Sequence, residues 1–321
     1  MCAADNCPHV DLTMRPHHLM CLFCLRGGGD PPDREAAGLD AKLEAIQKDR
    51  NLLIRLKTAF DCIGGPTTFP EQYDPATRRK DLQVLRALNL VPDSIRNARE
   101  LLMRWLPKDV PNLEGICRLE RQSGPAWQEC PVARTDAYQK GLEEGIIVLR
   151  EAEEKARAKE ESCAEIASTG RLQVRPHHLL CILCAYGGGM REPLVEDNLW
   201  EVLVRSRENP DVEIELIEGA CMVCPPCTGY DPERGICDAG CGLRDRLKDL
   251  NTFYMLGLQH GDVLPARQLW ALLFDKIESL ADICDNPDGV VPEWATCGGT
   301  HSGKYERLRA EGVDKLLNPD E

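Results

Sequence analysis

The sequence predicts an α+β fold, predominantly helical, built as a pseudo-two-fold tandem duplication of a cysteine-rich metal-binding domain. Three observations favour this: a histidine-containing motif occurs twice, the two halves end in the same cysteine pattern, and 17 of 321 residues are cysteine. A repeat of this length is interpreted before any local pattern. We expect a divergent first repeat over residues 1–135, a charged helical connector over 136–170 and a complete second repeat over 171–321.

Each repeat opens with Arg-Pro-His-His-Leu, followed by two cysteines and three glycines. Residues 15–29 match residues 175–189 at 10 of 15 positions, with a constant offset of 160. Proline suits the first turn of a helix and glycine its end, so the motif predicts a short helix. His177, Cys181 and Cys184 would lie along one stripe of that helix. The alternative is a buried apolar helix whose cysteines act as small hydrophobic residues.

The later parts of the two halves also correspond. An Ile-Cys pair, a tryptophan and a further cysteine end each half at an offset of 167, as Ile116-Cys117, Trp127 and Cys130 and then Ile283-Cys284, Trp294 and Cys297. Apolar periodicity predicts helices over 34–59, 82–90, 94–106 and 198–209, and alternation predicts a half-buried strand over 212–217.

Charge and composition exclude several classes of partner. The net charge of −14 repels nucleic acid and anionic membrane, so we expect neither as a partner. There is no apolar stretch long enough to span a membrane, and the first residues lack the features of a signal peptide. We therefore expect a soluble, cytoplasmic protein. In a reducing cytosol, frequent cysteine indicates metal or redox chemistry rather than disulfides.

The second half carries the densest cysteine cluster, Cys221, Cys224 and Cys227 at two-residue gaps, followed by Cys237 and Cys241. Two-residue gaps are typical of the ligands of a [4Fe-4S] cluster. Zn²⁺ is the alternative, because two cysteine pairs suffice for a tetrahedral structural site. We expect one [4Fe-4S] cluster in the second repeat, and a second cluster if the first repeat is also loaded.

The candidate ligands extend beyond this cluster. For the second repeat they are Cys221, Cys224, Cys227, Cys237, Cys284 and Cys297; for the first repeat they are Cys62, Cys117 and Cys130; Cys181 and Cys21 on the motif helices are further candidates. The first repeat has no cysteine opposite Cys224 or Cys227, so its site is predicted to be the weaker one.

The two motifs also supply candidate catalytic residues, namely Arg15, His17, His18, Arg175, His177 and His178. Histidine titrates near neutrality and is suited to proton transfer, while arginine is suited to holding a small anionic substrate. Neither a phosphate-binding loop nor a dinucleotide fingerprint accompanies them, so redox chemistry is the enzyme class that the sequence favours. In the alternative, metal ligation only supplies folding free energy and the acidic surface meets a protein partner.

The Arg-Pro-His-His-Leu-Leu-Cys opening, the Cys-x2-Cys-x2-Cys cluster and the terminal Ile-Cys, Trp and Cys together resemble a small bacterial and archaeal family, domain of unknown function 1284. Residues 173–298 resemble one complete unit and residues 13–131 a more divergent one, whereas family members are typically single units. The resemblance implies a cysteine-rich, iron–sulfur-binding intracellular protein. We therefore predict a redox or electron-transfer role with a redox partner protein or a small-molecule substrate, and, as the alternative, a zinc-stabilised protein-interaction module.

Overall fold

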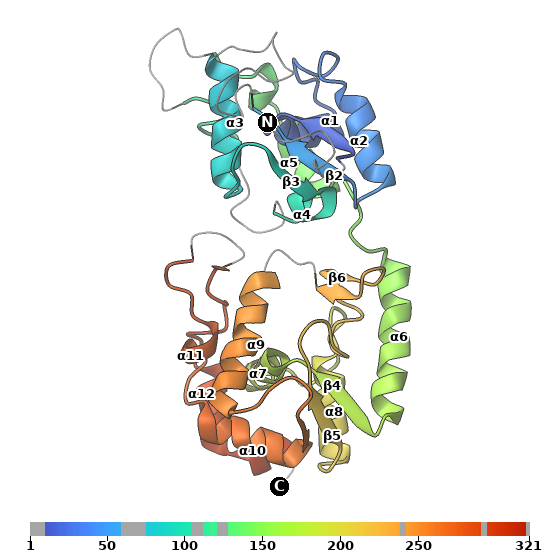
Figure 1. Ribbon diagram of the computed structural model, residues 1–321, viewed down its shortest axis with the longest axis vertical. Helices are drawn as coiled ribbons and strands as arrows, with labels where there is room; N and C mark the ends of the chain where they lie inside the picture. Colours follow the sequence, from blue (N-terminus) through green and yellow to red (C-terminus); the bar gives the residue numbers. More distant parts are fainter. Residues whose placement is uncertain are drawn as a thin grey trace, which may run out of the picture. The chain divides into compact units, whose positions relative to one another are not determined.

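The structure is a computed structural model that describes residues 10–58, 75–104, 112–120, 128–237, 242–289 and 294–318. It confirms the predicted α+β class and divides the chain into two compact units, Met1–Leu149 and Arg150–Glu321 (Figure 1). Each unit has its own apolar core. Within the described ranges, no helix combines the length and apolarity that a membrane crossing requires.

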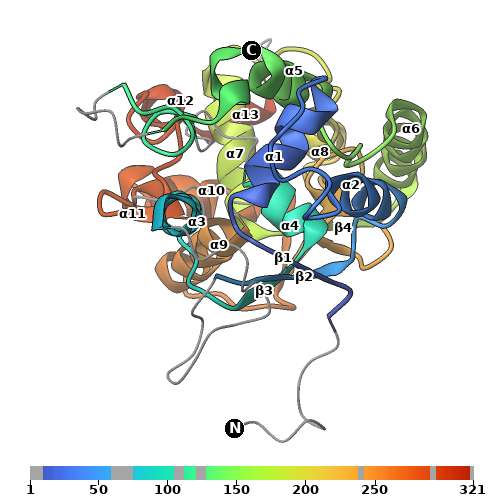
Figure 2. The ribbon, with the colours of Figure 1, turned by 90° about the horizontal axis from the view of Figure 1, so that it is seen from above.

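Unit 1 is organised around a three-stranded sheet of β1 (Leu12–Met14), β2 (Leu53–Leu56) and β3 (Ser94–Asn97), which lie side by side in Figure 2. Strand β1 pairs parallel with β2, and β2 pairs antiparallel with β3. The described helices of this unit are α1 (His18–Arg26), α2 (Leu39–Lys48), α3 (Pro75–Ala87), α4 (Ala98–Met103), a 3-10 turn (Pro131–Arg134) and α5 (Ala137–Glu144).

Unit 2 has a sheet of the same order and directions, in which β4 (Arg171–Val174) pairs parallel with β5 (Glu213–Leu216), and β5 pairs antiparallel with β8 (Val263–Pro265). A small hairpin joins β6 (Tyr230–Asp231) to β7 (Ile236–Cys237). The described helices are α6 (Ala152–Ser168), α7 (Pro176–Gly187), α8 (Leu199–Glu208), α9 (Gly242–Leu256), α10 (Ala266–Lys276), α11 (Ala281–Cys284), α12 (Lys304–Glu311) and α13 (Val313–Leu317).

Local sequence explains several of these elements. In β5, Ile214 and Leu216 are fully buried while Glu213 is exposed, as alternation along a half-buried strand requires. The predicted strand over 212–217 is therefore confirmed. The predicted helix over 198–209 is likewise confirmed, as α8.

The glycine triplets at the ends of α1 and α7 permit close helix packing. A Cβ atom on Gly27 would lie 2.0 Å from the carbonyl oxygen of Ala137, at the start of α5, and one on Gly187 would lie 2.2 Å from the carbonyl oxygen of Lys304, at the start of α12. Gly189 also has a φ of +102°, a left-handed conformation that glycine adopts without strain. The triplets therefore position a neighbouring helix against each motif helix.

Two predicted helices are wrong in part. The range 34–59 contains α2 and then strand β2, and the range 94–106 begins with strand β3 before α4. Pairing with β2 draws residues 94–97 into the sheet, which overrides their local pattern. The side chain of Asn97 then caps α4 by accepting from the backbone N–H of Glu100 at 2.6 Å.

Residues 136–170 do not form one free connector. Helix α5 packs against α1 in unit 1, and α6 packs against α8 in unit 2. Asn198 Nδ2, next to α8, donates to Ser162 Oγ of α6 at 2.8 Å. Gly141 allows α5 to approach α1, because a Cβ atom there would lie 1.8 Å from the carbonyl oxygen of Phe23. The boundary between the units therefore lies between Leu149 and Arg150.

Candidate metal centres

An arginine, an aspartate and a histidine form a buried network at the start of α7. Nε and Nη2 of Arg175 donate to Oδ2 of Asp249 at 2.8 and 2.6 Å. Oδ1 of Asp249 accepts from the backbone N–H of His177 at 3.1 Å and contacts His177 Nδ1 at 2.7 Å. These side chains are at most 4% exposed. One carboxylate from α9 therefore holds both the arginine and the histidine of the motif.

Unit 1 contains the same network with Asp81 of α3. Nε and Nη2 of Arg15 donate to Asp81 Oδ2 at 2.9 and 2.6 Å, and His17 Nδ1 lies 2.7 Å from Oδ1. Both Arg15 and Arg175 are closed off from solvent and face internal carboxylates. Each guanidinium is already paired with an internal carboxylate through two donors to one oxygen, which argues against the expectation that it receives a small anionic substrate.

Burial keeps three of the four motif histidines neutral. It lowers the pKa of His18, His177 and His178 to about 4 each. They therefore do not titrate near pH 7, contrary to the prediction that they carry protons there. A carboxylate only accepts hydrogen bonds, so neutral His177 donates from Nδ1 to Asp249 and keeps a lone pair on Nε2. A carboxylate that fixes the histidine tautomer in this way is a common feature behind metal-binding histidines.

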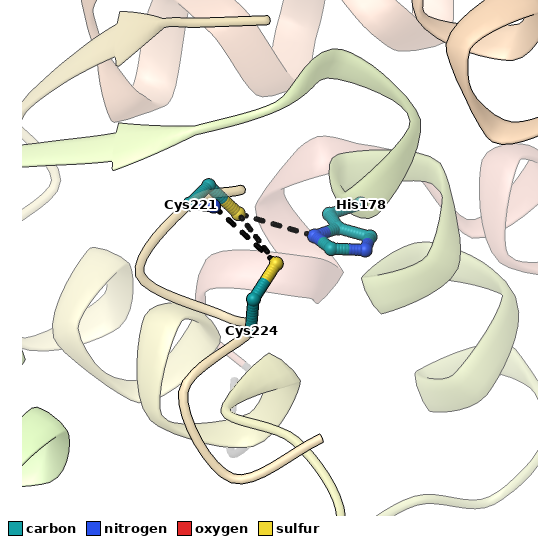
Figure 3. A group of neighbouring side chains, drawn as sticks. All are labelled: His178, Cys221 and Cys224. Atoms are coloured by element: carbon teal, nitrogen blue, oxygen red, sulfur yellow. Dashed lines mark hydrogen bonds between the residues drawn. The ribbon is translucent and has the colours of Figure 1, made fainter. Parts of the chain in front are cut away.

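His178 faces the cysteine loop of unit 2, where its side chain converges with those of Cys221 and Cys224 (Figure 3). His178 Nδ1 lies 3.1 Å from Cys221 Sγ, and the two sulfur atoms are 3.9 Å apart. All three ligand atoms lie within 4.8 Å of one another. On a single tetrahedral zinc with bonds of ~2.3 Å, two thiolates are separated by roughly 3.8 Å. This spacing therefore fits one metal ion.

The thiols of this pair differ in acidity. Burial would raise the pKa of Cys221, but the Cys224 thiol, two backbone N–H groups and the charge of Arg175 together lower it. The hydrogen bond from Cys224 to Cys221, with burial, raises the pKa of Cys224. Cys221 is therefore the thiol that first becomes a metal-binding thiolate.

Cys227 and Cys237 extend the group. After burial, the charges of Cys237 and Cys224 raise the pKa of Cys227, so these thiols are electrostatic neighbours. The buried guanidinium of Arg150 holds their loop by donating to the carbonyl oxygen of Pro225 and, at 3.0 Å, to that of Cys227. We call His178, Cys221, Cys224, Cys227 and Cys237 the loop group.

A second set of cysteines in unit 2 gathers around the other part of α7. Burial raises the pKa of Cys284 to about 11, and the charges of Cys297 and Cys184 add to this. Cys284 and Cys297 likewise raise the pKa of Cys181. The backbone N–H of Cys297 donates to the carbonyl oxygen of Cys284 at 3.3 Å, and a Cβ atom on Gly299 would lie 2.9 Å from Cys184 Sγ. Cys181, Cys184, Cys284 and Cys297 are thus electrostatic neighbours, and we call them the four-cysteine group of unit 2.

Unit 1 has a corresponding four-cysteine group, formed by Cys21, Cys24, Cys117 and Cys130. Burial raises the pKa of Cys24 to about 12, helped by the charges of Cys117 and Cys130, and both also raise the pKa of Cys21. The backbone N–H of Cys130 donates to the carbonyl oxygen of Cys117 at 3.0 Å. All four are free thiols.

These groups correct the predicted ligand sets. Cys284 and Cys297 were expected to complete the loop cluster, but they neighbour Cys181 and Cys184 instead. The reason is that one side of α7 faces the loop with Cys221, whereas another side faces the later segment with Cys284 and Cys297. Cys24 and Cys184 were missing from the predicted ligands, although both belong to the motif. Cys62 and Cys241 lie outside the described residues.

A lysine adjoins each four-cysteine group. Lys248 is 4% exposed, forms an ion pair with Asp245 at 3.0 Å and lowers the pKa of Cys181 and Cys284. Lys80 lowers the pKa of Cys117 in the same way. Sequence reasoning missed both lysines and the two network aspartates. Their signal was present, because Lys80-Asp81-Leu82 recurs as Lys248-Asp249-Leu250.

Among the described residues of unit 1, the motif histidines neighbour a carboxylate, while Cys62 lies outside those residues. His17, His18 and Asp33 form the other group whose ligand atoms all lie within 4.8 Å of one another. Asp33 was not predicted as a site residue.

Comparison of the protein with protein-family models, curated proteins and solved structures found no match, so the family resemblance stays a prediction.

Proposed function

We propose that this protein binds iron–sulfur clusters through its four-cysteine groups, one in each unit, and acts in electron transfer. The observation that carries the proposal is that four buried or half-buried free thiols converge on each motif helix, two from the helix and two from a later segment. Four thiolates are the usual ligand set of a [4Fe-4S] cluster. Each cluster would take one electron from a redox partner and pass it on.

The spacing within these groups favours a cluster over a single ion. Cys181 and Cys184, like Cys21 and Cys24, are three residues apart on a helix, so each pair lies on one face of it. A single zinc draws its thiolates to roughly 3.8 Å. Neither four-cysteine group is among the described groups whose ligand atoms lie within 4.8 Å of one another. A cubane, whose corners bind separate sulfurs, suits the wider spacing.

The surrounding charge also supports thiolate binding. Four thiolates carry net negative charge whichever metal they hold, and burial disfavours that charge. Lys248 in unit 2 and Lys80 in unit 1 each place a positive charge beside the thiols. Positive charge near a cluster stabilises its reduced form, so these lysines would raise the reduction potential.

We further infer that the two units arose by tandem duplication. The sheets have the same strand order and directions, and both motif arginines bind an aspartate of a later helix through the same atoms. In both four-cysteine groups, the helix pair is 3 positions apart in sequence and the later pair 13. The loop group is described in unit 2, and Cys62 of unit 1 lies outside the described residues.

Anaerobic purification of the full chain, followed by iron and acid-labile sulfide analysis, tests the proposal. We expect roughly eight irons and eight sulfides per chain, and a broad visible absorption that bleaches with dithionite. Cys184→Ser and Cys24→Ser should each remove about half of the iron and sulfide. Cys163→Ser is the matched control, because Cys163 lies on α6 apart from both groups and should leave both contents unchanged. Stoichiometric zinc without sulfide would overturn the proposal.

The alternative is a zinc-stabilised protein-interaction module, and the loop group favours it. The separation of 3.9 Å between Cys221 and Cys224, with His178 Nδ1 at 3.1 Å from Cys221, suits one zinc ion rather than a cluster. If all thiolate sites held zinc, metal ligation would serve folding and the acidic chain would act by binding a protein partner. The same metal analysis separates the two functions.

A further inference from the structure

Two imidazoles and a carboxylate meet at the start of α1 in unit 1. His17 Nε2 lies 3.0 Å from Asp33 Oδ2, and His18 Nε2 lies 3.6 Å from the same oxygen. His17 and His18 are 3% and 1% exposed, whereas the side chain of Asp33 is 33% exposed. The group is therefore buried on the histidine side and open on the aspartate side.

Among the described residues, neither ring nitrogen of His18 has a hydrogen-bond partner, although both nitrogens are buried. Buried polar groups in proteins are almost always paired, and an unpaired one indicates a function or an unseen ligand. The distance of 3.6 Å from Nε2 to Asp33 is too long for a hydrogen bond. The nitrogen is thus directed at the carboxylate but not satisfied by it.

The hydrogen-bonding pattern of His17 gives a second reason to place a cation here. Its Nδ1 lies 2.7 Å from Asp81 Oδ1, and a carboxylate can only accept there, so neutral His17 presents the lone pair of Nε2 to Asp33. Two lone pairs at 3.0 Å repel unless a positive charge lies between them. A single proton satisfies His17 and leaves His18 unpaired. One cation satisfies both nitrogens and the oxygen together.

We propose that His17, His18 and Asp33 bind one divalent first-row transition-metal ion in unit 1. Two imidazoles and one carboxylate are the donor set of many zinc and non-haem iron sites. Asp81 orients His17 from behind, as second-shell carboxylates do for metal-binding histidines. Three protein ligands leave a coordination position for water or a small ligand on the exposed side of Asp33, as in catalytic rather than closed structural sites.

The two units then differ in the chemistry beside their motif helices. In unit 2, His178 contacts the sulfur of Cys221, which makes a soft donor set. In unit 1, the equivalent histidine faces an oxygen donor. The proposal does not depend on iron–sulfur binding, because none of the three proposed ligands is a cysteine.

Co²⁺ is a suitable probe, since it occupies zinc and iron sites and reports its ligands. Full-length protein that retains its thiolate-bound metal is freed of loosely held metal with a mild chelator and titrated with Co²⁺. We expect one added cobalt per chain, without the intense absorption of cobalt–thiolate bonds. Proton magnetic resonance should show a strongly shifted, exchangeable imidazole N–H signal from each of the two histidines.

Variants locate the ion. Asp33→Asn and His18→Gln should each weaken cobalt binding roughly 10-fold or more, and Asp81→Asn should weaken it by roughly 10–100-fold. Asp30→Asn is the control, because Asp30 is 82% exposed and bonds only the neighbouring Arg34 among the contacts described here. Asp33 is surface-accessible, so Asp33→Asn should fold even if His18→Gln does not. The iron and sulfide contents should be the same in Asp33→Asn as in the wild type.

Three results would overturn the proposal: folded wild-type protein that binds no added cobalt, cobalt bound with thiolate absorption, or equal binding by Asp33→Asn. Because these results leave the iron and sulfide contents unaffected, they are distinguishable from failure of the electron-transfer proposal.

Discussion

Replacing Asp249 with asparagine should destabilise unit 2 strongly. Asp249 is 1% exposed and is the carboxylate that receives both the guanidinium of Arg175 and the ring of His177. Its removal leaves a buried guanidinium without a compensating charge. Breaking a buried ion pair in this way costs about 3–5 kcal/mol, so we expect the free energy of unfolding to fall by that amount.

Urea denaturation of the full chain, followed by circular dichroism and by hydrogen exchange of unit 2 amides, measures the loss. Asp211→Asn is the matched control, because Asp211 forms an arginine–aspartate pair with Arg267 in the same unit with side chains 67% and 52% exposed. An exposed pair contributes only about 0–1 kcal/mol. Asp81→Asn should reproduce the large effect in unit 1.

A loss for Asp249→Asn no larger than that for Asp211→Asn would refute the reasoning. It would mean that Arg175 finds another partner or reaches water when the carboxylate is gone. Arg175 and Asp249 would then not be the fixed support of the motif helix.

Three further predictions follow from single contacts. Lys248→Met should lower the reduction potential of the proposed unit 2 cluster by roughly 90 mV, because a buried charge several ångströms away contributes about 2 kcal/mol at an effective dielectric constant near 20. Voltammetry measures this potential, and Lys276→Met, at an exposed lysine, is the control. An unchanged potential in Lys248→Met would contradict the prediction. In metal-free protein, the contribution of neutral His177 is complete above its ordinary pKa of 6.5 and is lost as the pH falls towards its folded pKa of about 4, so His177 should account for roughly 3 kcal/mol of the drop in unfolding free energy over that range, with His18 and His178 adding to it. His177→Gln should make this urea-measured dependence less steep by that amount, and an equally steep profile would count against it. Gly187→Ala should cost about 1–3 kcal/mol because its Cβ would lie 2.2 Å from the carbonyl oxygen of Lys304, whereas Gly170→Ala, with open space around it, should be nearly neutral in thermal unfolding.

The sequence by itself determined the local features of this protein. The proline and glycines of the motif predicted a short helix, and α7 begins at Pro176 and ends within the triplet. Alternation over 212–217 predicted β5, because the sheet has one buried face. The recurrence of the motif and of the terminal cysteine pairs also indicated which residues carry chemistry. These features depend on neighbours along the chain, which periodicity and turn preference report directly.

Only the tertiary structure decided which of those residues act together. Asp249 meets Arg175 across 74 positions of sequence, and no periodic pattern connects them. The same holds for the division of the cysteines, since Cys284 returns to the stripe of α7 that carries Cys181 while His178 faces the loop. Neighbouring residues on a helix point about 100° apart, so each meets whichever segment packs on its side.

Asp33 shows the same limit most clearly. Nothing in the local sequence marks it as a ligand, and the cysteines drew attention to soft metals. Its proposed role follows from a turn that brings its carboxylate to two buried imidazoles, one of which has no hydrogen-bond partner in the described part of the chain. Burial and pairing are properties of the packed chain, and they decide the donor set of a site because an unpaired polar group in the interior must find a partner.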